Sequence, residues 1–87
     1  MQHRTINQEV NITAVSFQNG SADLDTLPRR MEWKGQTYTF REGLQRLIGK
    51  GKSVIRIFDM SDGEAHYRLM SDADQLNWTL VNITRGA

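Results

Sequence analysis

The chain has 87 residues, no cysteine and a net charge of +1, with 38% hydrophobic and 24% charged residues. Its length allows one domain but not two with separate cores. The lack of cysteine excludes disulfides, thiolate metal sites and cysteine nucleophiles, and it suits a reducing cytoplasm. The first residues hold no apolar signal-peptide core, and no apolar stretch approaches the roughly 20 residues that cross a bilayer. We therefore expect a cytoplasmic protein with a loosely held segment over residues 1–9 and a single β domain over residues 10–84.

The first predicted strand covers residues 10–17 and changes phase within itself. Its apolar residues occupy even positions up to Ala14 and then odd positions, at Val15 and Phe17. A period of two with such a change is typical of a strand that contains a bulge or a sharp twist. The sequence therefore predicts an irregularity near Ala14.

A tight hairpin is predicted over residues 30–40, with Lys34-Gly35 as its two-residue loop. Loops of this length join neighbouring antiparallel strands and set their register. In that register Met31 lies opposite Tyr38, and both share an apolar face with the tryptophan that precedes the loop.

Residues 42–48 change to a period that is typical of a short helix. Leu44, Leu47 and Ile48 stand at i, i+3 and i+4, which places them on one helical face. The charges at the two ends also match a helix dipole. The internal Gly43 is unfavourable in a helix, so the alternative is a long hairpin arm over residues 42–50.

The remaining sequence predicts a meander of three strands over residues 53–60, 64–70 and 76–84, separated by turns rich in Asp and Ser. A second change of phase at Val81 again indicates a bulge or a corner. Together the elements predict a mostly β fold. We expect a small antiparallel meander of five or six strands, an SH3-like barrel or β-roll, with the one short helix.

Two features of the sequence are shared with other proteins. They are a Trp-(Lys/Arg)-Gly hairpin and a closing Trp-x-Leu strand. The residues concerned are Pro28-Arg29-Arg30, Trp33-Lys34-Gly35, Tyr38, Asp62-Gly63, Tyr67-Arg68-Leu69 and Trp78-Thr79-Leu80. In these residues the chain resembles small uncharacterised bacterial proteins, over roughly residues 28–83. The shared residues are mostly structural, and the resemblance implies a small β domain without an assigned activity.

The sequence predicts no catalytic residue, metal site or cofactor. Residues 49–53 resemble the end of a phosphate-binding loop, but the earlier glycine is missing and a strand follows where a helix is required. His66 has no nucleophile or acid fixed beside it by the sequence. Asp59, Asp62 and Glu64 do not follow the spacing of a calcium loop. We expect a protein that is not an enzyme, and the sequence identifies no small-molecule substrate.

The charge is unevenly distributed along the chain. Residues 29–56 contain eight basic and two acidic residues, a net charge of +6, whereas residues 1–28 carry −2 and residues 57–87 carry −3. Such a segment either contacts an acidic partner or pairs with the acidic strands of its own fold. The residues expected to contact an acidic partner or nucleic acid are Arg29, Arg30, Lys34, Arg46, Lys50 and Lys52.

The resulting functional expectation is a small, non-catalytic interaction module. It would bind a protein partner or a second copy of itself through an exposed strand edge, without membrane contact. The alternative is nucleic-acid binding through the basic segment over residues 29–56, with Trp33 or Tyr38 stacking on bases.

Overall fold

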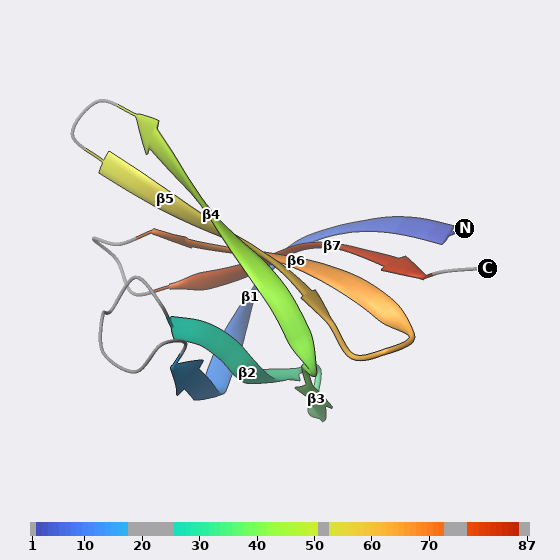
Figure 1. Ribbon diagram of the computed structural model, residues 1–87. Coiled ribbons are helices and arrows are strands. Elements are labelled where there is room, and N and C mark those ends of the chain that lie inside the picture. The colour runs from blue at the N-terminus through green and yellow to red at the C-terminus, as the bar shows by residue number, and fades with distance from the viewer. Residues whose placement is uncertain (1, 18–25, 51–52, 73–76, 86–87) are drawn as a thin grey trace.

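The computed structural model describes residues 2–17, 26–50, 53–72 and 77–85. These residues form seven antiparallel strands in one strongly curled sheet, in the order β3-β2-β1-β7-β6-β5-β4 (Figure 1). The mostly antiparallel β fold is confirmed. The strands outnumber the five or six expected, and the SH3-like barrel or β-roll is not confirmed. The strands are β1 (Gln2–Phe17), β2 (Thr26–Trp33), β3 (Gln36–Thr39), β4 (Glu42–Lys50), β5 (Ser53–Ser61), β6 (Ala65–Asp72) and β7 (Trp78–Arg85).

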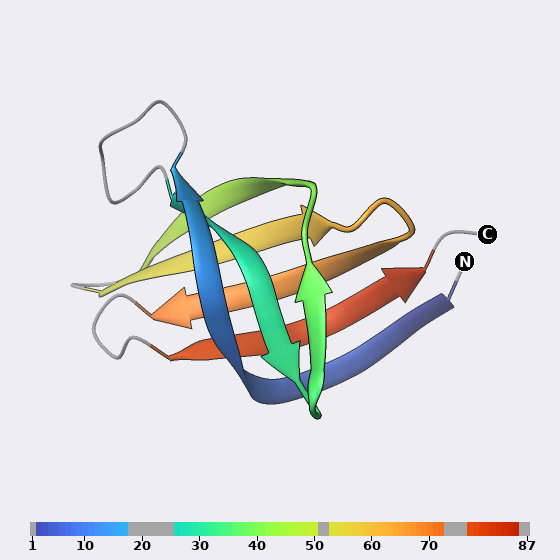
Figure 2. The ribbon, with the colours of Figure 1, turned by 90° about the horizontal axis from the view of Figure 1, so that it is seen from below.

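The longest strand, β1, belongs to both halves of the curl. Its residues 2–10 pair with β7 and its residues 11–17 pair with β2. Figure 2 shows this strand turning a corner between the two partners. Asn7 lies in the first half with a φ of 51°, a left-handed conformation that Asn adopts more readily than most residues. Residues 2–5 and 8–9 are thus paired with β7, and the register shifts between Thr5 and Gln8.

Both predicted irregularities are confirmed. In β1 the pairing with β2 shifts on either side of Ala14. In β7 the pairing with β6 passes from Asn82 to Leu80, so that Val81 has no partner in the register. Bulges of this kind bend a strand and increase its twist, which allows a single sheet to curl into a half-barrel.

The hairpin of β2 and β3 has the predicted register. Met31 is opposite Tyr38, and Trp33 is opposite Gln36. The two loop residues, Lys34 and Gly35, have φ values of 53° and 75°. Positive φ at both positions is the type I′ geometry that matches the twist of the strands it joins.

The short helix expected over residues 42–48 is wrong, because this segment is strand β4 and pairs with β5 along its whole length. In the register with β5, Leu44 and Ile48 lie on the outer face of the sheet and Leu47 lies on the inner face. A strand that is apolar on both faces therefore produces the same spacing as one face of a helix. The alternative of a hairpin arm is confirmed.

The core lies on the concave face of the curl and takes its buried residues from β1, β2, β5, β6 and β7 and from Phe40. Four rings form a continuous aromatic row: Trp33 lies 6.1 Å from Tyr38, Tyr38 lies 5.8 Å from Tyr67, and Tyr67 lies 5.3 Å from Phe40, measured between ring centroids. The buried hydrophobic residues are Val10, Leu27, Met31, Trp33, Phe40, Phe58, Met60, Ala65, Tyr67, Leu69, Leu80 and Ile83.

The turn between β5 and β6 is organised by one carboxylate. Asp62 accepts hydrogen bonds from the backbone N–H groups of Glu64 and Ala65, at 2.9 and 2.8 Å. It also accepts one from the Tyr67 hydroxyl at 2.8 Å. Gly63 supplies the positive φ of 99° that the turn requires. Desolvation would raise the pKa of Asp62, but these donors outweigh it and the pKa lies below its ordinary value.

Candidate functional site

The six basic residues predicted to contact a partner lie on different elements. β2 and β4, which carry most of them, lie far apart in the order of the sheet, although its curl brings these two strands into contact. Arg29 and Arg30 are on β2, Lys34 is in the hairpin loop, Arg46 is in the middle of β4, Lys50 ends β4, and Lys52 lies outside the described residues.

The aromatic residues of the β2 and β3 hairpin are largely engaged inside the fold. Trp33 is only 9% exposed, and its Nε1–H donates to Oε1 of Gln8 at 3.0 Å. The Lys34 ammonium covers the Trp33 ring at 5.0 Å from the centroid. Tyr38 is half-buried, and its hydroxyl donates to Gln36 at 2.9 Å. The ring of Tyr38 is therefore more accessible than that of Trp33.

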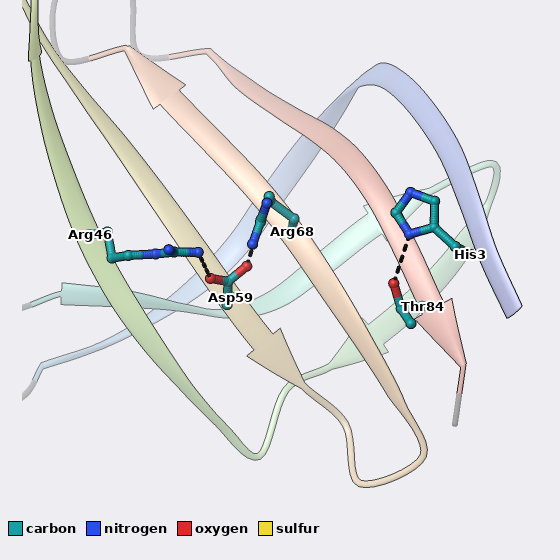
Figure 3. Close-up of polar contacts among 5 residues, drawn as sticks. All are labelled: His3, Arg46, Asp59, Arg68 and Thr84. Atoms are coloured by element: carbon teal, nitrogen blue, oxygen red, sulfur yellow. Dashed lines mark hydrogen bonds and ion pairs between the residues drawn. The ribbon is translucent and has the colours of Figure 1, made fainter. Parts of the chain in front are cut away.

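Arg46 is part of an ion-pair network on the outer face of the sheet (Figure 3). One carboxylate oxygen of Asp59 accepts a hydrogen bond from Arg46, and the other accepts one from Arg68 at 2.8 Å. Desolvation would raise the pKa of Asp59, but the two guanidinium groups outweigh it and lower the pKa below its usual range. The charge of Arg46 is thus offset within its own chain.

A hollow of about 360 Å³ on this outer face brings together an acid, a serine and a histidine. The Oγ atom of Ser61 accepts the N–H of Gly63 at 3.1 Å, and the oxygens of Asp59 are occupied by arginine side chains. Within the described part of the chain, no hydrogen bond joins His66 to Ser61 or Asp59. Nucleophilic catalysis requires such a relay between nucleophile, base and orienting acid. The hollow lacks that relay.

Four of the five exposed large apolar side chains among the described residues lie on the hairpin of β4 and β5, and the fifth is Val15 on β1. Leu44 is 73% exposed, Leu47 49% and Ile48 47%, and Val54 on β5 is 41% exposed. The pattern of basic charges did not indicate these residues. The sequence does contain an indication of them. Between Gly43 and Gly49, apolar residues occupy both even and odd positions, and would therefore face both sides of a strand.

β4 is also an edge of the sheet (Figure 1). Its nine residues pair with β5 on one side only, which leaves the backbone groups that point to the other side without a strand partner in the sheet. The opposite edge, β3, is only four residues long. Of the two strands that end the sheet order, β4 therefore offers the longer free edge.

A second hollow, of about 210 Å³, lies on the concave side at the end of the sheet where β1 begins and β7 ends. Its lining combines aromatic rings with two guanidinium groups from opposite ends of the sequence: Gln2, Arg4, Trp33, Tyr38, Ile83 and Arg85. No pattern in the sequence indicates this cleft, because only the pairing of β1 with β7 brings Arg4 and Arg85 together.

No helix in the described segments is long and apolar enough to cross a membrane. Comparison with known proteins gave no match among protein-family models, curated proteins or solved structures. The resemblance to small bacterial β-domain proteins thus stays a prediction.

Proposed function

We propose that this chain is a non-catalytic interaction module that self-associates by pairing β4 with β4 of a second copy. The observation that carries the proposal is a nine-residue free edge bordered by exposed Leu44, Leu47 and Ile48. Long, apolar, unprotected edge strands invite pairing with another strand, and natural monomers usually block them with proline, charge or a covering segment. β4 contains no proline, and its central charge, on Arg46, is offset by Asp59 of the same chain.

The sequence of β4 favours a second copy as the partner. Read outward from Arg46, three of the four flanking pairs match chemically: Leu44 with Ile48, Gly43 with Gly49, and Glu42 with Lys50. The fourth pair sets the polar Gln45 against the apolar Leu47. Antiparallel pairing about a two-fold axis at Arg46 places each residue opposite its counterpart in the other copy.

This register makes favourable contacts on both sides of the axis. Leu44 stands opposite Ile48 of the second copy, and cross-strand apolar pairs of this kind stabilise a sheet. Glu42 stands opposite Lys50 of the second copy, which joins opposite charges at each end. The only like charges that meet are the two Arg46 residues, each already paired with its own Asp59. Self-pairing would join two curled sheets into one continuous sheet.

A charge exchange tests both the interface and its register. Glu42→Lys and Lys50→Glu each place like charges opposite one another twice in the dimer. Each should therefore raise the dissociation constant of the dimer by about 2- to 30-fold. The double variant restores opposite charges and should recover the original value. Analytical ultracentrifugation over a wide range of protein concentrations gives the constants.

A second pair of variants separates the edge from general surface hydrophobicity. Leu44→Asp should abolish self-association, because it places a charge opposite the apolar side chain of Ile48 in the second copy, once on each side of the axis. Val15→Asp is the matched control, because Val15 is 46% exposed but lies on β1, and it should leave association unchanged. A chain that is monomeric at every concentration would overturn the proposal. Salt-sensitive binding of oligonucleotides confined to residues 29–56 would then favour the nucleic-acid alternative.

A further inference from the structure

We propose that the concave cleft between Arg4, Arg85 and Tyr38 binds a small single-ring aromatic carboxylate. This inference does not depend on the β4 interface, since the cleft lies on the opposite face of the sheet from Leu44 and is built by β1, β7 and the β2 and β3 hairpin. The cleft combines paired positive charges, aromatic walls and a small volume.

The two arginines are held close together by strand pairing. Gln2 is opposite Arg85 and Arg4 is opposite Ile83, so the arginines are diagonal neighbours on one face of β1 and β7. Diagonal neighbours are about 7–8 Å apart at the backbone, within reach of long side chains. Both guanidinium groups line the same cleft, and neither forms an ion pair with an acidic side chain among the described residues.

Among the residues that the structure describes, the acidic turn that precedes Ala65, the residue opposite Arg85, forms no ion pair with either arginine. Asp62 is already engaged by two backbone N–H groups and by the Tyr67 hydroxyl. Burial and the bond to Asp62 raise the pKa of Tyr67 well above its ordinary value, whereas the positive charge of Arg85 acts in the opposite direction. Two like charges without a counterion favour an anion, and guanidinium groups match the planar fork of a carboxylate.

The walls of the cleft favour a flat ring. Trp33 and Tyr38 contribute aromatic surface with their rings tilted by 43°, and the buried Ile83 adds an apolar wall. Tyr38 is the more open of the two rings, and offset or edge-on contacts with a ligand ring are the geometry such side chains prefer. A ring seated there can direct its acidic group to Arg4 and Arg85.

The size of the cleft limits the ligand. Its volume of about 210 Å³ is below the roughly 300–1,000 Å³ of pockets that bind drug-sized molecules. A single ring with a short acidic arm suits this space better than a nucleotide, which adds a sugar and a phosphate. We therefore assign the cleft to the smaller class.

Phenylacetate is a suitable probe, and amide-resolved NMR of the full chain is a suitable measurement. The expected result is a saturable shift of the Trp33 indole N–H and of the amides of Arg4, Tyr38 and Arg85. Three related compounds separate the chemical requirements: phenylacetamide has no charge, cyclohexylacetate has no aromatic ring, and inorganic phosphate has no ring at all. Each should bind at least several-fold more weakly than phenylacetate.

Two variants test the arginines. Arg4→Gln and Arg85→Gln should each weaken phenylacetate binding about tenfold or more, because each removes a charged hydrogen bond. Arg30→Gln is the matched control, an exposed arginine on β2 outside the cleft, and should leave binding unchanged. The absence of saturable shifts, or equal binding of phenylacetamide or phosphate, would overturn the proposal, and this comparison needs only the unaltered chain.

Discussion

Strands β4 and β6 flank the same neighbour, β5, and pair with it over most of their length, yet their surroundings differ completely. In β6 buried and more exposed positions alternate without a break, and Ala65, Tyr67 and Leu69 fill the core. In β4 the apolar residues occupy both phases and stay exposed. Position in the sheet explains the contrast, because β6 has a strand on each side and β4 is an edge. The same backbone pairing thus supports folding in one strand and leaves a surface for contact in the other.

The largest expected effect is on the free energy of unfolding, and it appears when one leucine of β6 and one leucine of β4 are each replaced by alanine. Leu69→Ala removes a fully buried side chain from β6 and should lower the free energy of unfolding by about 2–5 kcal/mol. Leu44→Ala removes a side chain that is 73% exposed and should change it by less than about 0.5 kcal/mol. Urea denaturation of dilute, monomeric protein measures both values. Equal losses in the two variants would contradict the assignment of β4 as a surface strand.

An intermediate effect on the free energy of unfolding is expected from the two glycines of β4, because only one of them is closely packed. A Cβ atom at Gly43 would collide with the Met60 side chain and approach the Asp59 carbonyl oxygen to 2.9 Å, whereas a Cβ at Gly49 would meet nothing within 4 Å. Gly43→Ala should therefore cost about 1–3 kcal/mol of unfolding free energy. Gly49→Ala should stay within about 0.5 kcal/mol of the original protein. Thermal and urea unfolding of the two variants give the comparison, and a harmless Gly43→Ala would show that the base of β4 is loosely packed.

The smallest effect concerns the turn that begins β6, and it depends on pH. The lowered pKa of Asp62 means that its carboxylate stabilises the fold at neutral pH. This contribution is lost as the pH falls from about 5 towards the lowered pKa. Asp62→Asn should cost about 1 kcal/mol at pH 7, and the cost should shrink on acidification.

Glu64→Gln provides the control for that measurement. Glu64 is exposed in the same turn, and its backbone N–H, not its side chain, contacts Asp62. Unfolding curves collected between pH 3 and pH 7, the range in which a carboxylate such as Asp62 titrates, should therefore separate the two variants. A cost of Asp62→Asn that is independent of pH would show that the charge of the carboxylate does not contribute.

Local patterns in the sequence were sufficient for the strands and for several of their details. The loop of Lys34 and Gly35 determined the register of its hairpin, and the phase changes at Ala14 and Val81 located two bulges. These features depend on residues close together in the sequence. The segment over residues 42–48 was misread because its spacing fits both a helix and a strand with two apolar faces, and only the position of β4 at an edge distinguishes them.

The candidate sites were harder to predict because they depend on contacts between distant segments. Arg4 and Arg85 are 81 positions apart, and the sequence gives no sign that their strands pair. The charge pattern directed attention to Arg46, whose charge is offset by Asp59 on the neighbouring strand. Sequence periodicity describes which face a residue lies on, but it does not reveal what lies opposite.

The pairing of β1 with β7 also has a consequence for how the chain folds. These strands are the first and last in the sequence, and they adjoin in the middle of the sheet order. The hairpins β2 with β3 and β4 with β5 can form from local contacts, but the sheet is joined only when the two ends of the chain meet. Closing so long a loop is entropically costly, and folds dominated by such contacts reach the native state in milliseconds to seconds. Until β1 and β7 pair, their edges are as open as that of β4. Whether this pairing precedes contact with a second chain therefore determines which of the three edges pairs first.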